Sequence, residues 1–520
     1  MGGAGREIER TAERGGSMID TPLGINPEMA YDVGVHEGVR DRIARLGDRI
    51  AELSDRQEEL AGMVGIGDAT NLTWTDVFNG YASVVVVAFL TTLLATPLMR
   101  RLAISNGIVD HPNDARKIHR MPVAYLGGVA VFLGIMAGIL VSYVGARMEG
   151  VIRFHATEHL TIWGHPHLVP PWIVLGIFVI MLIGLIDDVA GISPRLKVGG
   201  QLFAAAALAY GQVGVNVAKG LLSPTLGALL QNSELTYHIP LPEGVPIVGE
   251  LFGQYIEIDF IYWTGTAVIA AFVLGGCNAS NLIDGLDGLC SGVTAIATVG
   301  FLAIAMMMVE DPNASGWLDS ARIVLCMSVL GACLGFLPHN FNPATIFLGD
   351  CGSLLLGFVS VVIILTLGDT GRTDLVVAGL IIYSIPIIDT ALAIIRRKLA
   401  KQRMSDADKN HLHHMLTRAF GVKGAAFSLY GIGAGFAVLG VLMAASNARI
   451  VYTAALLFSS FIAVYATKIA RKKQLEEQSL AMRGATASAP AAPVPPTPGS
   501  SESDAGAETN RGRDGRPVGV

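Results

Sequence analysis

The chain has 520 residues, of which 52% are hydrophobic and only 15% are charged, and its mean hydropathy is +0.51. Soluble globular proteins carry about 25% charged residues, so this composition excludes that class. The net charge of −6 says little, because a membrane protein sorts its charges between loops on its two sides. We expect no nucleic-acid partner.

Residues 1–77 are polar and acidic, and a heptad pattern runs through about residues 36–66. Sustained a/d positions with charged flanks favour a coiled coil, which would pair two copies as a homodimer. The alternative is an amphipathic helix on the membrane or on the body of the protein. Its polar face has no Lys, which disfavours the membrane surface. Only Gln57 interrupts the seam, which comprises Val39, Ile43, Leu46, Ile50, Leu53, Leu60 and Val64.

Residues 78–470 contain a succession of apolar stretches near the ~20 residues that cross a bilayer as a helix. They predict an all-α polytopic membrane protein with a transmembrane domain of about eleven helices. The tail, residues 471–520, is rich in Ala, Pro, Gly and Ser, and we predict that it is disordered. The predicted spans are about 78–99, 124–146, 170–186, 198–215, 262–278, 286–308, 319–337, 352–369, 375–396, 424–445 and 448–468.

Basic residues gather in alternate loops. The loops 100–123, 187–197, 279–285, 338–351 and 397–423, with the tail, hold most of the Lys and Arg, whereas the other loops hold only Arg147, Arg153, Lys219 and Arg372. Positive charge marks the cytoplasmic side. We therefore predict a multi-pass protein of the bacterial inner (plasma) membrane with its N-terminus outside and its tail in the cytoplasm. Within the outer loop 216–261, the alternation in YHIPLPEGVPIVGELFGQYIEIDF predicts a small hairpin.

Five polar motifs fall on the predicted cytoplasmic side, so they can form one site. They are DHPNDARKIHRMPVAYLGG, DDVAGISPRLKVGGQ, NASNLIDGLDGLCSG, FLGDCGSLLLG and DADKNHLHHML. Carboxylates bind Mg²⁺ and leave positions for substrate phosphates, Lys and Arg neutralise phosphate charge, and Gly beside an acid lets the backbone approach a ligand. The pattern predicts a metal-bound diphosphate, and the membrane setting suggests a lipid as second substrate.

Each motif also has a plainer interpretation. Asp187 and Asp188 could mark the end of a span. Asp284 and Asp287 would share a face if they were helical, but helix N-termini favour acids in any case. The HLHH run could bind zinc, but no Cys lies near it and the carboxylates favour a hard metal, so phosphate binding is preferred. None of the five cysteines has zinc-site spacing, and we interpret them as buried thiols (Cys277, Cys290, Cys326, Cys333 and Cys351).

With these motifs in family order across roughly residues 78–470, the chain resembles the polyprenyl-phosphate N-acetylhexosamine-1-phosphate transferases. That family includes the phospho-N-acetylmuramoyl-pentapeptide transferase of peptidoglycan synthesis and the initiating transferases of lipopolysaccharide O-antigen and teichoic acid. The resemblance implies that undecaprenyl phosphate attacks the β-phosphorus of a UDP-N-acetylhexosamine in one step or two, releases UMP, and initiates a lipid-linked envelope polysaccharide.

The histidine run helps to choose a branch of the family. The run HLHHML, preceded by ADKN, departs from the longer run of the muramoyl-pentapeptide branch. The resemblance therefore favours UDP-GlcNAc as donor. The muramoyl-pentapeptide transferase remains the alternative.

The resemblance also implies roles for individual residues. Asn281 and Asp350 match the ligands of Mg²⁺, for which Mn²⁺ could substitute. Asp187, with its neighbour Asp188, matches the base that deprotonates the lipid phosphate. That proton is already largely lost at neutral pH, so Asp187 could instead orient the nucleophile or bind metal. Residues matching substrate-binding positions are Asp284 and Asp287 (nucleotide), Phe347 (uracil stacking), His411, His413 and His414 (sugar and diphosphate), Asp110, Lys117 and His119 (first-loop motif) and Lys197 (phosphate).

Two other classes of function are compatible with an apolar, multi-pass chain. A transporter would place ionisable residues near the bilayer midplane on broken helices. Here the acids lie at span ends, except Asp389 in IPIIDTALAIIRR, which could support the site. A scaffold that kept the fold and lost catalysis is the second rival. The intact Asp187, Asp188, Asn281 and Asp350 argue against it.

Overall fold

The computed structural model describes residues 74–110, 122–148, 161–162, 165–166, 168–240, 255–310, 316–399 and 411–446, with the single residues 460, 464, 468 and 479. The chain divides into two units, Met1–Asp76 and Val77–Val520, and the second is described below. The predicted coiled coil, almost all of the eleventh span and of the tail, and the first-loop residues Lys117 and His119 lie outside the described residues.

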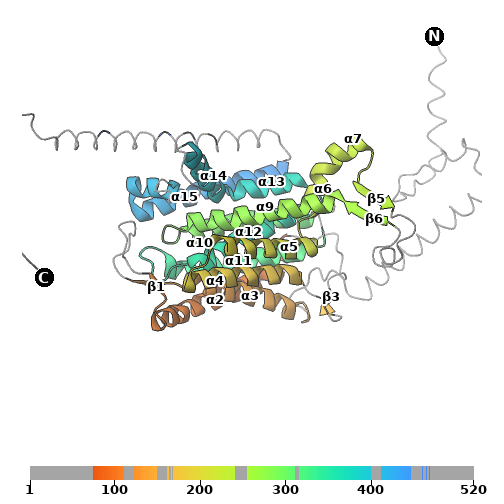
Figure 1. Ribbon diagram of the computed structural model, residues 1–520. Coiled ribbons are helices and arrows are strands. Elements are labelled where there is room, and N and C mark those ends of the chain that lie inside the picture. The colour runs from red at the N-terminus through yellow and green to blue at the C-terminus, as the bar shows by residue number, and fades with distance from the viewer. Residues whose placement is uncertain are drawn as a thin grey trace, which may run out of the picture. The chain divides into compact units, whose positions relative to one another are not determined.

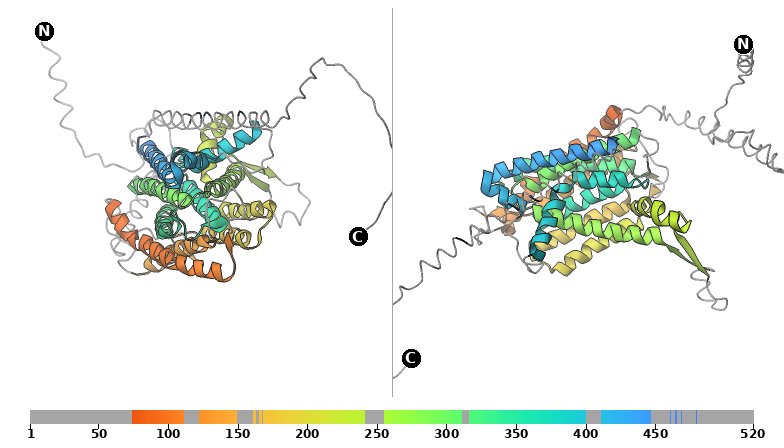
Figure 2. Two further views of the ribbon diagram at one scale, coloured as in Figure 1. Left: turned by 90° about the vertical axis from the view of Figure 1, so that its left-hand side faces the viewer. Right: turned by 90° about the horizontal axis from the view of Figure 1, so that it is seen from above.

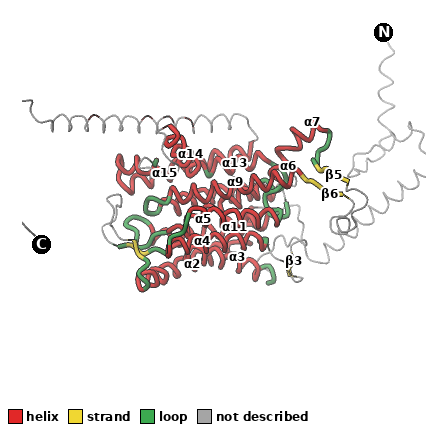
Figure 3. The backbone as a smooth tube through the Cα atoms, in the orientation of Figure 1, coloured by secondary structure: helices red, strands yellow, loops and turns green. Residues whose placement is uncertain are grey.

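The described part of the second unit is built from helices, with short strands only at the two ends of the helical bundle (Figures 1 and 3). The long helices are α2 (Trp74–Ser105), α3 (Gly127–Gly145), α4 (Pro171–Ala190), α5 (Pro194–Tyr210), α9 (Phe260–Ile283), α10 (Leu289–Glu310), α11 (Asp319–Asn340), α12 (Gly349–Leu367), α13 (Thr373–Ile382), α14 (Ser384–Leu399) and α15 (Leu412–Ser446). Shorter pieces are α6 (Asn216–Leu222), the π-helical turn Ser223–Gly227 and α7 (Ala228–Leu230).

Eight of the described helices are long and apolar enough to cross a membrane, and the bent pair α13–α14 would make nine. This confirms an all-α polytopic membrane protein. The predicted count of eleven spans is not confirmed, because α5 has only 17 residues and the last span lies outside the described residues.

Two helices differ from the sequence-based expectation. The predicted span 375–396 is two helices that meet at a bend of 77°. The predicted span 424–445 belongs to α15, which begins already at Leu412 and is kinked at Gly421. The histidine run, expected in a loop, therefore occupies the start of a helix. The polar residues of this run lower the local hydropathy, which hides a helix start from a hydropathy criterion.

The helix α12 lies at the centre of the bundle, as the end-on view of Figure 2 illustrates. In the apolar stretch of α12, 94% of the residues are buried within the protein, compared with 22% in that of α2. Its sequence is apolar on all sides, as expected of a helix surrounded by others; α3, α4, α9, α10 and α11 pack against it. By contrast, residues such as Leu94, Leu140 and Phe178 are exposed on peripheral helices. Asp350 therefore stands in the first turn of the innermost helix.

Glycines set how closely the neighbours of α12 approach it. A Cβ atom on Gly128 of α3 would lie 2.1 Å from the backbone nitrogen of Gly352, and one on Gly357 would lie 2.4 Å from the carbonyl oxygen of Gly276 in α9. Side chains at these positions would push the helices apart. Small residues at helix contacts are typical of membrane proteins, where close backbone packing takes over from the hydrophobic effect between helices.

The strands mark the two ends of the bundle. At one end β1 (Val109–Asp110) pairs with β2 (Val123–Ala124). At the other end lie β3 (Thr161–Ile162) with β4 (His165–Pro166), and β5 (Thr236–Pro240) with β6 (Tyr255–Asp259). The antiparallel pair β5–β6 confirms the hairpin predicted within 216–261. The side of the membrane on which it lies stays a prediction.

A buried ion pair joins two helix ends. Arg322 of α11 is fully buried; its Nη1 lies 2.7 Å from Oδ1 of Asp319, and its Nη2 donates to the carbonyl oxygen of Thr366 at the end of α12 (2.6 Å). A buried charge is tolerated when it is paired and hydrogen-bonded. Arg322 thereby ties the start of α11 to the end of α12.

We predict that Arg322→Leu lowers thermal stability strongly, by about 3–5 kcal/mol, because it leaves the Asp319 carboxylate buried without its cation. The measurement is the thermal unfolding midpoint of the detergent-purified protein. Arg372→Leu is the matched control: the Arg372–Asp374 pair is 29% exposed on both sides, so its loss should cost less than about 1 kcal/mol. Equal shifts for the two variants would contradict the role given to Arg322.

Candidate active site

The described parts of the five motifs meet at the β1–β2 end of the bundle. The first loop contacts the fourth, because the backbone nitrogens of Gly127 and Gly128 donate to the carbonyl oxygens of Phe347 and Leu348. The second and third loops reach the fourth through Asp350, and the histidine run touches the third at Gly285, as detailed below. The predicted convergence of five separate segments on one place is confirmed for the described residues.

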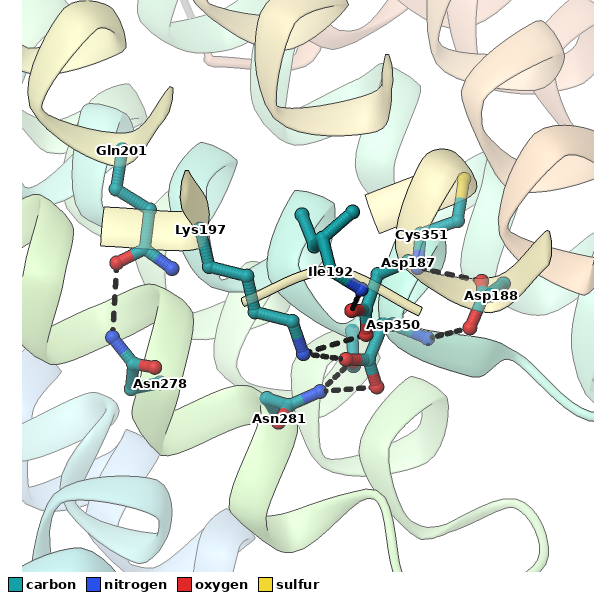
Figure 4. A network of polar contacts seen from close by, with 10 residues as sticks. Asp187, Asp188, Ile192, Lys197, Gln201, Asn278, Asn281, Asp350 and Cys351 are labelled. Atoms are coloured by element: carbon teal, nitrogen blue, oxygen red, sulfur yellow. Dashed lines mark hydrogen bonds and ion pairs between the residues drawn. The ribbon is translucent and has the colours of Figure 1, made fainter. Parts of the chain in front are cut away.

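Lys197 is the centre of this arrangement (Figure 4). Its ammonium nitrogen lies 2.6 Å from Oδ2 of Asp187 and also contacts Oδ2 of Asp350. Asp187 is in the last turns of α4, Lys197 near the start of α5 and Asp350 at the start of α12, so three helix ends meet at one cation. Burial opposes the charge on Lys197, but the two carboxylates outweigh it and raise the pKa of the ammonium group.

Asp188 holds the backbone that carries Asp350. Its Oδ1 accepts from the backbone nitrogen of Asp350 (2.8 Å) and its Oδ2 from that of Cys351 (2.9 Å), so both carboxylate oxygens are used at the start of α12. Negative charge is favourable at a helix N-terminus. Gly349 has a left-handed φ of +72°, and a Cβ there would lie 2.6 Å from Oδ2 of Asp188. This geometry favours a positioning role for Asp188; its predicted catalytic role stays a prediction.

Asn281 completes the group. Near the end of α9, its Nδ2 donates to Oδ1 of Asp350 (2.8 Å) and to Oγ of Ser353 (3.0 Å). One helical turn away, the side chain of Asn278 donates to Oε1 of the fully buried Gln201 (3.0 Å). Two neighbouring turns of α9 therefore make polar contacts with two different helices, Asn281 with α12 and Asn278 with α5.

The donor set fits a divalent hard cation. Among the described residues no three His, Cys, Asp or Glu side chains group as a ready-made metal cage. Mg²⁺ does not need one, because it is usually held by one or two carboxylates, waters and substrate phosphates. Asp187 and Asp350 already converge on a cation, Lys197, and rotation of the Asn281 amide would present its oxygen to the same place. With Asp188 nearby, the described centre has three carboxylates for one ammonium group, so a further positive charge would be stabilised there.

The turn between α9 and α10 differs from the expectation. Asp284 and Asp287 lie in non-helical residues after Ile283 and before Leu289, so the condition for a shared helical face is not met. The Oδ2 atom of Asp287 accepts from Nδ2 of Asn342 (2.8 Å) and from the backbone of Ala344 (3.1 Å). Asp287 thus fastens the α11–α12 loop to the turn. Contact of either acid with a nucleotide stays a prediction.

The carboxyl group of Asp284 lies where a negative charge is strongly disfavoured. Its burial, and then the nearby carboxylates of Asp350, Asp188 and Asp287, raise its pKa well above the usual range of a carboxyl group. A carboxyl group that stays protonated can donate a hydrogen bond. Carboxyl groups with strongly perturbed pKa values cluster at functional sites.

Two aromatic rings lie beside the carboxylates. Phe347 and Tyr125 are tilted by 60° with ring centroids 6.0 Å apart, and Phe347 is half-buried. Burial and the surrounding carboxylates, first Asp110 and then Asp188, raise the pKa of Tyr125. Asp110 ends β1, opposite Val123 of β2. Phe347 and Tyr125 therefore form one aromatic patch, and the stacking of uracil on Phe347 stays a prediction.

The histidine run is anchored by Asp389 of α14. Nδ1 of His411 lies 2.9 Å from Oδ2 of Asp389, and Oδ1 of Asp389 accepts from the backbone nitrogen of Leu412 (2.7 Å). The rings of His411 and His413 are stacked 5.5 Å apart, and that of His414 lies 4.3 Å from His413. A Cβ on Gly285 would lie 2.5 Å from Nε2 of His413, so this run reaches the Asp284–Asp287 turn.

Sequence reasoning missed three contributors. Gln201 lies four residues after Lys197, on the same helical face, and Ser353 lies three after Asp350, so helical spacing could have found both. Tyr125 stood inside the first-loop motif without a stated role. Asp110, Phe347 and Asp284 lie at the same end of the bundle as Lys197, but no direct contact joins them to it in the described contacts.

The sequence of this chain is similar to those of known transferases. The model of glycosyl transferase family 4 matches residues 171–368. The chain is similar to a probable undecaprenyl-phosphate N-acetylglucosaminyl 1-phosphate transferase of Bacillus subtilis, with 32% identity over 363 residues, 69% of this chain and 83% of the relative. It is also similar to the decaprenyl-phosphate N-acetylglucosaminephosphotransferase of Mycolicibacterium smegmatis (30%, covering 64% and 75%) and to the phospho-N-acetylmuramoyl-pentapeptide-transferase of Desulforudis audaxviator (28%, covering 68% and 95%).

We predict that Gly349→Ala destabilises the fold more than Gly107→Ala. The two glycines have nearly equal left-handed φ values, +72° and +71°, for which an L-residue costs about 1–2 kcal/mol, but only a Cβ at Gly349 meets the Asp188 carboxylate, whereas Gly107 has open space around it. Thermal unfolding midpoints of the two variants measure the difference. Equal midpoints would show that the Asp188 contact does not constrain the start of α12.

Proposed function

This chain belongs to glycosyl transferase family 4, and we propose that it transfers N-acetylglucosamine 1-phosphate from UDP-GlcNAc to undecaprenyl phosphate. The observation that carries the proposal is the Lys197 centre, where carboxylates from α4 and α12 share one ammonium group beside Asn281. The family relation makes the protein a multi-pass membrane transferase. The names of two relatives supply N-acetylglucosamine phosphate and a polyprenyl phosphate as the substrates to test.

In the proposed reaction an oxygen of the lipid phosphate attacks the β-phosphorus of UDP-GlcNAc. The bond from that phosphorus to the oxygen bridging to UMP breaks, UMP leaves with the bonding electrons, and a lipid-diphosphate sugar forms. Transfers of this kind depend on positioning and charge neutralisation more than on covalent chemistry.

Lys197, Asp187 and Asp350 are assigned to the diphosphate region. The ammonium group of Lys197 would contact phosphate oxygens, as a lysine point charge does in other phosphate sites. Since it is already held between two carboxylates, its position is fixed before substrate arrives. Asp187, whose Oδ1 accepts from the backbone of Ile192 (2.9 Å), is assigned to orient the acceptor phosphate.

Asp350 and Asn281 would hold Mg²⁺, with Mn²⁺ as a substitute. When bound, the ion would spread the charge that develops on the leaving phosphate. Asp188 keeps Asp350 in place through the α12 backbone. Tyr125 and Phe347 are assigned to the nucleoside, because their ring pair offers apolar surface for a base, and His411, His413 and His414 to the sugar and diphosphate.

We predict that purified protein forms lipid-linked GlcNAc from UDP-GlcNAc and undecaprenyl phosphate, and that Asp350→Ala or chelation of Mg²⁺ lowers the rate at least 100-fold. Asp350 is in direct contact with Lys197 and Asn281, so its loss dismantles the centre. Radiolabelled product extracted into organic solvent is the measurement. Decaprenyl phosphate and UDP-MurNAc-pentapeptide complete the substrate panel.

Asp374→Ala is the control for that assay, since Asp374 lies at the start of α13 and pairs with Arg372, away from the centre. It should keep the wild-type rate. Wild-type transfer after both Asp350→Ala and chelation would refute the metal assignment. Use of UDP-MurNAc-pentapeptide in preference to UDP-GlcNAc would move the protein to the other branch of its family.

We predict that the Lys197 end faces the cytoplasm and the β5–β6 end faces outward. Ser193 and Ser233 are exposed serines at these two ends, whereas all five native cysteines are buried, so Ser193→Cys and Ser233→Cys form a matched pair. A membrane-impermeant maleimide added to intact cells should label Ser233→Cys and leave Ser193→Cys unlabelled until the cells are lysed. The reverse pattern would invert the proposed orientation.

A further inference from the structure

Asp389 is a buried carboxylate that the phosphate centre does not use. It lies in α14 after the 77° bend, is 1% exposed, and interrupts the largely apolar stretch IPIIDTALAII. A carboxylate in such a place is costly unless it is paired and hydrogen-bonded. Its partners therefore indicate what it is for.

Both carboxylate oxygens have a partner at the start of α15. Oδ2 meets Nδ1 of His411 at 2.9 Å, and Oδ1 accepts from the backbone nitrogen of Leu412 at 2.7 Å. One side chain of α14 thus caps the first residue of α15 and holds the imidazole beside it. Nδ1 of His413 lies farther away, at 3.8 Å, and makes no hydrogen bond in the described residues.

The contact has a consequence for the proton on His411. An ionised carboxylate only accepts hydrogen bonds, so Nδ1 of His411 must carry the hydrogen in this pair. Within the described residues no hydrogen bond to Nε2 of His411 is found, which leaves Nε2 as the ring atom for a ligand. A carboxylate partner fixes both the orientation of a histidine ring and the nitrogen that bears the proton.

The anchored ring lies next to the rest of the site. His411 stacks on His413 with an angle of 15° between the rings, and His413 approaches the α9–α10 turn at Gly285 so closely that no side chain fits there. A change in the orientation of the His411 ring would therefore displace the His413 ring and, through it, the Asp284–Asp287 turn.

We propose that Asp389 is a positioning residue for the sugar-phosphate transfer: it sets the orientation of His411 and keeps a hydrogen on Nδ1, so that Nε2 meets the substrate. The kinetic test of this proposal rests on the proposed function. The effect of Asp389 on the His411 ring does not, and it can be measured without any substrate.

Asp389→Asn separates this role from simple capping. The amide oxygen of Asn can still accept from the Leu412 backbone, but its NH₂ group can only donate toward Nδ1 of His411, which moves the ring hydrogen to Nε2. The cap and the volume are kept while the proton pattern is reversed. Thr390→Val is the matched control: Thr390 is the next residue, and its hydroxyl group makes no hydrogen bond in the described residues.

We expect Asp389→Asn to lower kcat at least 30-fold, with KM for UDP-GlcNAc within threefold and the unfolding midpoint close to that of the wild type. Loss of a partner that orients a catalytic-site histidine typically costs 10- to 100-fold or more. Thr390→Val should stay within twofold in kcat. Wild-type kcat in Asp389→Asn would overturn the proposal and leave Asp389 as a helix cap only.

A double-mutant cycle tests whether Asp389 acts through His411. In a His411→Gln background, adding Asp389→Asn should lower kcat by less than twofold further, because residues that act as a unit are not additive. A further loss as large as that of the single variant would overturn the assignment.

The third measurement needs no activity. In protein labelled with ¹⁵N at histidine only, the His411 signals are identified by their absence in His411→Gln. Nδ1 of His411 should be protonated in the wild type and unprotonated in Asp389→Asn. An unprotonated Nδ1 in the wild type would refute the inference even if transfer is observed. Absence of transfer by the wild type would refute the proposed function and leave this result to stand by itself.

Discussion

The ammonium group of Lys197 lies between the carboxylates of Asp187 and Asp350, and the arrangement of the whole site depends on this contact. Two carboxylates that approach each other at the end of a helical bundle repel, and the repulsion is stronger where water is partly excluded. A cation between the two carboxylates offsets this repulsion and links them through its own attraction to each. Because the three residues come from α4, α5 and α12, the bridge also fixes how these helix ends lie relative to one another.

The helices supply the geometry that makes this contact available. The carboxylate of Asp350 is in the first turn of α12, the most buried helix, and glycines such as Gly352 and Gly357 let α3 and α9 approach that helix at backbone distance. Asp188 then binds the first backbone N–H groups of α12 with both its oxygens. Close packing, a helix N-terminus and a left-handed glycine at position 349 act together to leave Asp350 little freedom.

Much of this could be predicted from the sequence. The long helices were predicted from the length of the apolar stretches, and the gathering of five polar motifs at one end was predicted from the alternation of the loops. Both predictions succeed because neither depends on the detailed packing of side chains. The bend between α13 and α14 was not predicted, although Pro386 in the first turn of α14 disfavours a continuous helix there. The helical start at Leu412 could not be predicted, since the residues there are too polar for a hydropathy criterion. Asp287 shows a second limit. Its spacing from Asp284 suited a helix, but its bonds to Asn342 and Ala344 are tertiary contacts that spacing does not encode.

The site has two parts that are held in different ways. Lys197, Asp187, Asp350 and Asn281 belong to helices that pack around α12, so their positions follow from the core of the bundle. His411 directly precedes α15, His413 and His414 lie in its first turn, and Asp389 ties this segment to α14. Where His413 meets Gly285, the two parts touch. In the proposed reaction the first part holds the diphosphate and the second the sugar together with the diphosphate, so their relative placement sets where the β-phosphorus lies. A buried carboxylate at position 389 would then be retained, despite its desolvation cost, because it fixes that placement.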